Sequence, residues 1–119
     1  MTKKEFKDFS QQTLADMLKL LNKKNNDYTA GSQTAFANFE GSKEYGIDPL
    51  IGLCLRMHDK TKRIQTFCQK GFLDVDNESV EDAFKDLIGY SVIALGMIHD
   101  SNKVETQPSP LSEDADRIF

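Results

Sequence analysis

The sequence has no tryptophan, two cysteines and only three prolines among 119 residues. So little proline excludes collagen-like and low-complexity chains. No run approaches the ~20 apolar residues of a transmembrane helix, and no apolar run follows the charged N-terminus as it would in a signal peptide. Cations are not in excess either: the net charge is -4. An acidic chain is a poor nucleic-acid binder, because neutralising phosphates requires a basic surface. We therefore expect a cytoplasmic protein with no membrane and no direct nucleic-acid partner.

The sequence is long enough for a single domain with its own core. Apolar residues recur at helical spacing in three long segments, approximately residues 2–23, 48–70 and 78–99, and a shorter helix is plausible near 32–39. No segment alternates convincingly as a strand. The fold class predicted is all-α, a helical bundle of three long helices plus a short one. We expect one helical domain over residues 1–100 with a long functional loop at 27–47, followed by an extended or mobile tail at 101–119.

Local signals mark several helix ends. Thr2 and Glu5 form a capping box at the first helix. Asp48 and Pro49 are typical of the N-cap and first position of the helix at 48–70, and Gly71 is typical of its C-terminal cap. Two polar residues, Asp76 and Asn77, precede the last helix.

The two cysteines, Cys54 and Cys68, are fourteen residues apart in one predicted helix. At the α-helical rise they lie roughly 21 Å apart, which no intrachain disulfide can bridge. Because Cys54 falls on the apolar stripe, we expect buried thiols in a reducing compartment.

An acidic stripe runs along the start of the last predicted helix. Glu78, Asp82 and Asp86 are spaced i, i+4, i+8, and Glu81 lies beside them. Stacked carboxylates on one helix face are suited to Mg²⁺, which prefers hard oxygen ligands. The alternative is an ordinary solvated face, with Glu81 and Lys85 as an ion pair within the helix.

A basic stripe lies on the preceding helix, where Arg56, Asp59, Lys60 and Arg63 follow one another at spacings of three and four. Three cations on one face could hold a phosphate chain. The alternative is ion pairing, within this helix or with the acidic stripe. If the two helices pack antiparallel, both stripes could line one cleft suited to a metal-bound nucleoside polyphosphate.

The predicted loop carries a third group of candidates. Tyr28 sits among amide and hydroxyl side chains, and Asn38-Phe39 follows. Such residues can stack on a base and contact its edge. They can equally be loop aromatics that cover the core.

The order of these residues resembles a known family. The order comprises Lys24, Asp27-Tyr28, Asn38-Phe39, Arg56, Asp59-Lys60, Arg63, Glu78, Asp82, Asp86-Leu87 and Tyr90. It is similar to a phage-borne all-α family, the nucleotide-modification-associated domain, which looks like a relative of the MazG-type pyrophosphohydrolases. The resemblance implies helical subunits that oligomerise and Mg²⁺-dependent cleavage of nucleoside triphosphates. The first acidic run of MazG enzymes is absent here, where the helix at 48–70 offers only Asp59, and the second is stretched to Glu78-x-x-x-Asp82.

Two nucleotide-handling hypotheses follow. In the first, a MazG-like pyrophosphohydrolase, the metal is held by carboxylates, Glu81 or Asp59 activates water, and cations and aromatics hold the substrate. The metal ligands would be Glu78, Asp82 and Asp86. The substrate-binding residues would be Tyr28, Asn38, Phe39, Arg56, Lys60 and Arg63.

In the second hypothesis the same fold sequesters a nucleotide without turnover and without a cofactor. A cationic cleft with aromatics suits a cyclic dinucleotide or a cyclic ADP-ribose-like immune signal, whose capture in the host cytoplasm would block anti-phage defence. A third hypothesis is a purely structural or protein-interaction role. In each case we expect a homo-oligomer, because the second half of the last helix is apolar nearly all round.

Overall fold

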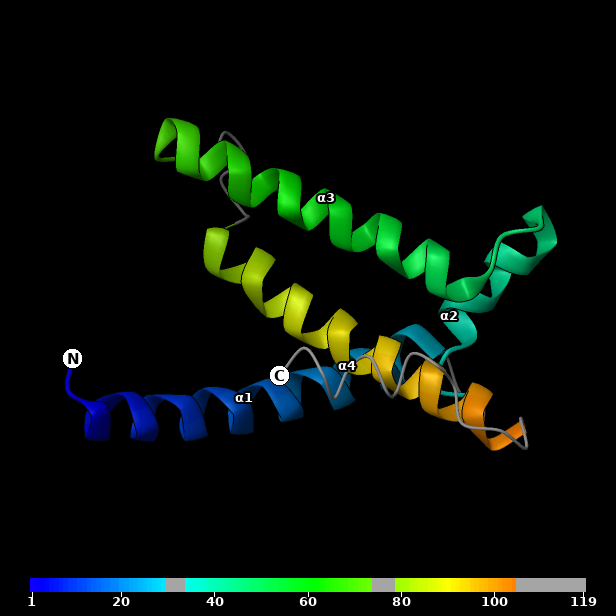
Figure 1. Cartoon of the computed structure of the whole chain (residues 1–119), viewed down its shortest axis with the longest axis horizontal. Helices are drawn as coiled ribbons and strands as arrows, with labels where there is room; N and C mark the ends of the chain where they lie inside the picture. Colours follow the sequence, from blue (N-terminus) through cyan, green and yellow to red (C-terminus); the bar gives the residue numbers. More distant parts are fainter. Residues whose placement is uncertain (30–33, 74–78, 105–119) are drawn as a thin grey trace.

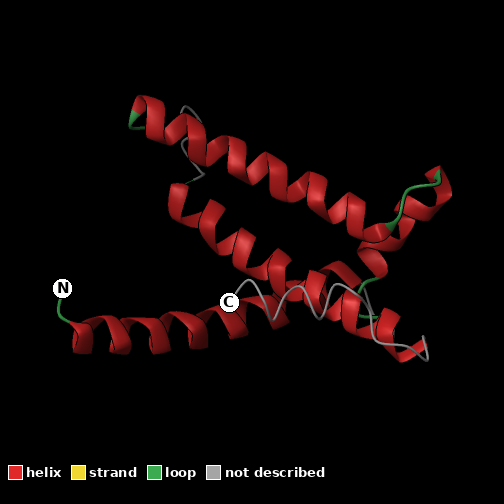
Figure 2. Ribbon diagram, viewed as in Figure 1, coloured by secondary structure: helices red, strands yellow, loops and turns green. Residues whose placement is uncertain are grey.

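The computed structural model describes residues 1–29, 34–73 and 79–104. Every element in this part of the chain is helical (Figure 2). The elements are α1 (Lys3–Thr29), α2 (Ala37–Glu40), the 3₁₀-helix η1 (Gly41–Tyr45), α3 (Pro49–Lys70) and α4 (Val80–Val104). The all-α prediction is therefore confirmed for the described residues. Residue Glu78 and the predicted tail beyond Val104 lie outside them.

The helix ends that the sequence marks most clearly form as predicted. At the start of α1, the Thr2 amide donates to the Glu5 carboxylate at 3.0 Å, and the Glu5 amide donates to Thr2 Oγ1 at 3.1 Å. Asp48 caps α3 by accepting from the Leu50 amide at 2.8 Å. Gly71 ends α3 with φ 82°, a left-handed conformation that costs glycine little.

The first helix is longer than predicted. It continues to Thr29 instead of ending near Lys23, so the segment expected as a loop at 27–47 begins inside α1 and then contains α2 and η1. Tertiary contacts explain the extension: Lys24 forms an ion pair with Asp86, and the side-chain Nδ2 of Asn25 donates to the Ala35 carbonyl at 2.7 Å. Helix propensity depends only on the residue types within the helix, so it takes neither contact into account.

The last helix also differs from its prediction. It reaches Val104 instead of His99 and so includes the first residues assigned to the tail. At its start, Ser79 Oγ accepts from the Asp82 amide at 3.1 Å, which is the bond expected of an N-cap. The predicted helix start at Asp76 and Asn77 lies outside the described residues.

Helices α3 and α4 run antiparallel, side by side, and α1 crosses α4 with its C-terminal turns next to α2 (Figure 1). The core forms where α2 meets α3 and α4. It contains Phe39, Leu53 and Met97, each at most 9% exposed. Gly96 lets α2 approach closely, because a Cβ at this position would lie 3.0 Å from the Phe36 ring. This junction fixes the orientation of the helices around the site.

The two cysteines are exposed, so the prediction of buried thiols is wrong. The buried face of α3 is centred on Leu53, and Cys54 lies about 100° around the helix from it, at the edge of that face. Cys68 lies near the end of α3, which little of the described chain covers.

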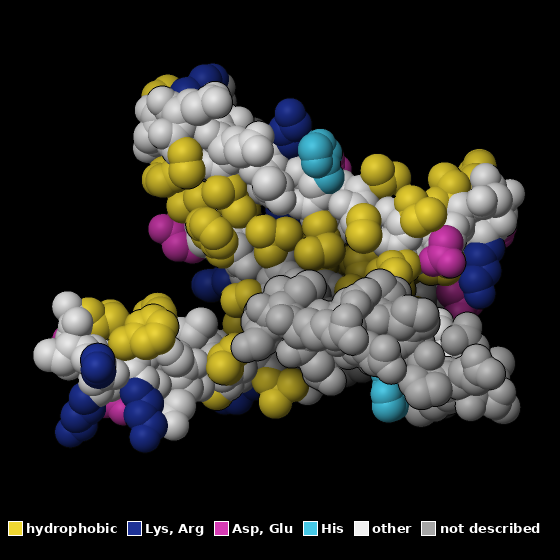
Figure 3. All heavy atoms as spheres, in the orientation of Figure 1, with side chains coloured by type: hydrophobic (Ala, Val, Ile, Leu, Met, Phe, Trp, Pro, Cys, Tyr) yellow, Lys and Arg dark blue, Asp and Glu magenta, His cyan; other side chains and the backbone are white. Residues whose placement is uncertain are grey.

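Large apolar side chains remain exposed on α1. Its N-terminal part, which carries Phe6, Phe9, Leu14 and Leu18 and which we call the apolar arm, extends away from α3 and α4 (Figure 1). Some of its hydrophobic side chains are visible in Figure 3, apart from the larger hydrophobic area over α3 and α4. Phe6 is 61% exposed and Phe9 is 57% exposed, and Leu14 and Leu18 are similarly open. Within the described residues, no helix is long and apolar enough to cross a membrane.

Candidate functional site

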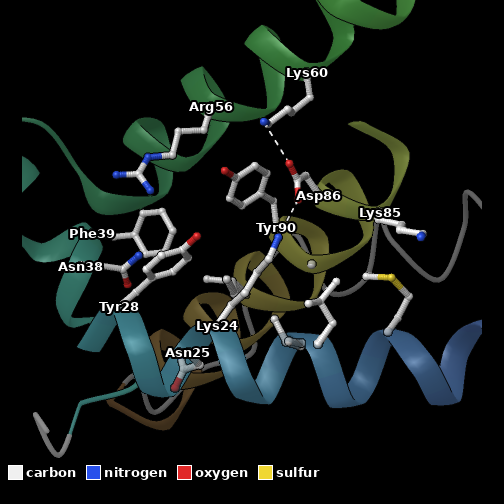
Figure 4. A pocket seen from close by; sticks show the side chains of 15 residues that line it. Lys24, Asn25, Tyr28, Asn38, Phe39, Arg56, Lys60, Lys85, Asp86 and Tyr90 are labelled. Carbon is white, nitrogen blue, oxygen red and sulfur yellow. Dashed lines mark hydrogen bonds and ion pairs between the residues drawn. The ribbon is translucent and has the colours of Figure 1, made fainter. Parts of the chain in front are cut away.

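A cavity of about 190 Å³ lies where α1, α2, α3 and α4 meet. Its floor is apolar, and its polar side chains come from all four helices (Figure 4). The lining residues are Met17, Leu20, Leu21, Lys24, Asn25, Tyr28, Asn38, Phe39, Arg56, Lys60, Lys85, Asp86, Gly89, Tyr90 and Ile93. Four of them carry a positive charge and one carries a negative charge, so the cavity is electropositive although the chain as a whole is acidic.

A carboxylate bridges two lysines on one side of this cavity. Lys24 Nζ of α1 lies 3.0 Å from Asp86 Oδ1, and Lys60 Nζ of α3 lies 2.9 Å from Asp86 Oδ2. We call this arrangement the lysine–aspartate bridge. It ties α1 and α3 to α4, and each oxygen of Asp86 accepts from a different helix. The side chains of Lys60 and Asp86 are only 19% and 21% exposed, so water screens the bridge weakly.

The bridge changes the proton affinity of its members. Burial raises the pKa of Asp86, but the hydrogen bonds and charges of Lys60 and Lys24 outweigh it and bring that pKa below its ordinary value. Burial lowers the pKa of Lys24, but the hydrogen bond and charge of Asp86 outweigh it and raise that pKa. Asp86 is therefore ionised and Lys24 protonated throughout the neutral range.

Aromatic rings line the cavity next to the bridge. Phe39 is 3% exposed, and the Arg56 guanidinium carbon lies 4.6 Å from its ring centre. This cation–π contact uses one face of the guanidinium and leaves the N–H groups on its edge available for hydrogen bonding. Tyr28 stands beside Phe39 at the mouth of the cavity and is 60% exposed, and Tyr90 lies between Arg56 and the bridge (Figure 4).

A second, shallower cavity of about 390 Å³ adjoins the first. The two cavities share the three bridge residues, together with Leu20 and Lys85. Arg63, Asp82 and Ala83 complete the second cavity. The lysine–aspartate bridge is therefore the wall between an aromatic cavity and a charged one.

Five of the predicted ligand-binding residues line the first cavity. They are Tyr28, Asn38, Phe39, Arg56 and Lys60. Arg63 lines the second cavity with Asp82, whereas the two predicted catalytic residues, Asp59 and Glu81, are exposed and line neither. The predicted antiparallel packing does bring the basic and acidic stripes together, through Lys60 and Asp86.

The carboxylates predicted to bind magnesium do not gather into one cluster among the described residues. Within residues 1–29, 34–73 and 79–104, no three His, Cys, Asp or Glu side chains come close enough to hold a metal ion. Asp82 is exposed, and both oxygens of Asp86 are occupied by lysines. The predicted ligand Glu78 lies outside the described residues.

Sequence reasoning assigned no site role to four polar lining residues, namely Lys24, Asn25, Lys85 and Tyr90. Helical spacing offered a signal for two of them. Lys24 precedes Tyr28 by four residues, and Tyr90 follows Asp86 by four, so each shares a helix face with a predicted site residue. For Lys24, that signal becomes usable only when α1 is known to continue beyond Lys23, whereas Tyr90 and Asp86 both lie in the helix predicted at 78–99.

No curated protein and no solved structure matches the chain significantly. A family described as nucleotide modification associated domain 1 matches residues 24–98. The matched segment is more than half of the chain, and it begins at Lys24 and includes every polar residue of the first cavity. The chain therefore belongs to the nucleotide modification associated domain 1 family.

Proposed function

We propose that this protein binds a phosphorylated nucleoside in the first cavity and holds its phosphate through lysine and arginine side chains. The observation that carries the proposal is the set of side chains that line the first cavity. Three aromatic rings, Tyr28, Phe39 and Tyr90, lie within the same cavity as Lys24, Arg56 and Lys60. The description of the family, which refers to nucleotide modification, supports the same class of ligand.

Each part of a nucleotide has a suitable partner in the cavity. Tyr28 offers an exposed ring on which a base can stack, and the Asn38 amide supplies both a donor and an acceptor for a base edge. Arg56 can donate two parallel hydrogen bonds to a phosphate, because its contact with Phe39 uses the guanidinium face and not its edge.

Retention of an intact nucleotide is the activity that this cavity supports best. Its cations can neutralise phosphate directly, and the carboxylate among them is engaged by two lysines. Sequestration of a nucleotide signal, such as a cyclic nucleotide of phage defence, would use the cavity in this way. MazG-like pyrophosphate cleavage would instead need further carboxylates, with Glu78 as the first candidate.

The test is a nucleotide panel incubated with the full chain, with Mg²⁺ or with EDTA, and resolved by mass before and after protein denaturation. We expect one nucleotide to be depleted from solution in EDTA and recovered intact. Arg56→Ala should weaken binding at least tenfold, whereas Lys62→Ala, which removes an exposed cation from the same helix, should not. A monophosphate product formed only with Mg²⁺ would establish hydrolysis instead, and no binding of any nucleotide would refute the proposal.

A further inference from the structure

Both ammonium groups of the lysine–aspartate bridge hold donors beyond those given to Asp86. An ammonium group has three N–H donors, and Lys24 and Lys60 each give one to the carboxylate. The Lys24 side chain is 41% exposed, so an anion can approach it from the cavity. The bridge is therefore a pair of cations, held in place by an anion of the protein itself, beside a space where another anion could bind.

The bridge lies where the nucleoside and the phosphate of a bound nucleotide would meet. On one side lies the cavity with the aromatic rings, and on the other lies the second cavity with Arg63. A nucleoside held by the rings would direct its phosphate toward the wall that the two cavities share. Lys24 and Lys60 belong to that wall, and so does Asp86.

We propose that Asp86 is a built-in counter-anion at a phosphate site, which competes with the ligand for Lys24 and Lys60 and so limits the affinity for phosphate. The inference rests on the proposed function and adds to it the place of the phosphate and a residue that sets selectivity. A phosphate monoester carries close to two negative charges at neutral pH. It must either displace the Asp86 carboxylate from a lysine or bind beside it against its charge.

Neutralising Asp86 should therefore strengthen phosphate binding. Asp86→Asn keeps the shape of the side chain and its acceptor oxygen, and removes the charge that repels the ligand. A carboxylate about 5 Å from a phosphate, in a partly screened site, weakens binding by about tenfold or more. An uncharged nucleoside does not compete with Asp86 for the two lysines, so it should bind equally well to the wild type and to Asp86→Asn.

The experiment uses calorimetric titration of the full chain, in EDTA and again with Mg²⁺. The probes are inorganic pyrophosphate and, for the base selected by the nucleotide panel, the nucleoside and its monophosphate. Asp86→Asn should bind pyrophosphate and the monophosphate about tenfold more tightly and leave nucleoside affinity unchanged. Lys60→Met should weaken binding of both phosphate probes. Asp8→Asn, which changes the net charge equally at an exposed position on the apolar arm, should match the wild type for all probes.

The possible failures are distinct. If the wild type binds a nucleotide and Asp86→Asn binds its monophosphate no more tightly, Asp86 is not a competing anion, although the proposed function stands. If Asp86→Asn loses binding that Mg²⁺ supports in the wild type, Asp86 is a metal ligand, and the inference is wrong. A change in nucleoside affinity equal to the change for the monophosphate would indicate a structural role. If the wild type binds no probe, both proposals fail together.

Discussion

The lysine–aspartate bridge should contribute measurably to folding, and a double-mutant cycle can isolate its strongest pair. The cycle uses Lys60→Met, Asp86→Asn and the two changes combined. Lys60 and Asp86 are 19% and 21% exposed, between the fully exposed pairs that contribute about 0.2–1 kcal/mol and the buried pairs whose disruption costs about 3–5 kcal/mol. We expect each single change to lower the free energy of unfolding by about 1–2 kcal/mol, with a coupling energy of about 1 kcal/mol.

Thermal and urea unfolding at pH 7 measure these differences. A loss of about 1 kcal/mol in a domain of this size lowers Tm by about 4–8 °C. Lys62→Met is the matched control, because Lys62 is exposed on the same helix, and its effect should be a few tenths of a kcal/mol at most. A coupling energy below about 0.3 kcal/mol would refute the idea that this ion pair stabilises the fold.

The pH dependence gives a second check on the same pair. The pKa of Asp86 is lower in the folded chain than its ordinary value of 3.8. Its stabilising contribution is therefore complete above pH 3.8 and is lost as the pH falls through the lower, folded-state value. The coupling energy should be equal at pH 5 and pH 7 and should shrink below pH 3.8. A coupling that already disappears between pH 7 and pH 5 would contradict the assignment to Asp86.

Three further predictions concern the rest of the fold. Gly71→Ala should lower the free energy of unfolding by about 1 kcal/mol in urea titration, because φ there is 82°, and an unchanged midpoint would contradict the assigned cap. Gly96→Val should cost about 1–3 kcal/mol, measured in the same way, because its side chain would displace the Phe36 ring, and a stabilised variant would show that α2 does not pack there. The apolar arm and α4 leave large apolar side chains exposed: those of the arm are at least 57% exposed, Val92 and Leu95 of α4 are 47% and 67% exposed, and Leu14, Leu18 and Val92 line one shallow apolar hollow. We propose that a second copy of the chain covers this apolar surface. Sedimentation should then give a dimer or larger assembly, which the double change Phe6→Ser with Phe9→Ser dissociates and the control Phe72→Ser does not. A monomeric wild type would refute the proposal.

The helix ends that could be predicted from sequence are those fixed by neighbours in the chain. Thr2 and Asp48 form their capping hydrogen bonds with residues at most three positions away. Gly71 ends α3 because glycine adopts the left-handed φ at its own position. The end of α1 could not be predicted in this way. Its last turns are held by the contact of Lys24 with Asp86, 62 residues later, and no local pattern contains that contact.

In the candidate site, too, the residues predicted correctly are those with a signal within one helix. Arg56 and Lys60 were predicted from a spacing of four on one helix, and the structure places both in the first cavity. Asp86 was also singled out, but as a magnesium ligand, because a carboxylate stripe on one helix does not reveal which cations face it. Two of those cations come from other helices, at 3.0 and 2.9 Å, and they define the environment of Asp86.

On the proposed phosphate site, the Asp86 carboxylate stabilises the unliganded fold but weakens phosphate binding. With no ligand bound, its carboxylate neutralises two lysines on two other helices, and without that carboxylate the repulsion between them would oppose the packing of α1 and α3 around α4. With a phosphate bound, the ligand itself supplies the negative charge, and Asp86 becomes a repulsive neighbour. The same substitution, Asp86→Asn, should therefore lower the stability of the unliganded protein and raise its affinity for a phosphorylated ligand. It follows that saturating nucleotide should raise the Tm of Asp86→Asn by more than that of the wild type, because the tighter-binding protein gains more from the same ligand concentration.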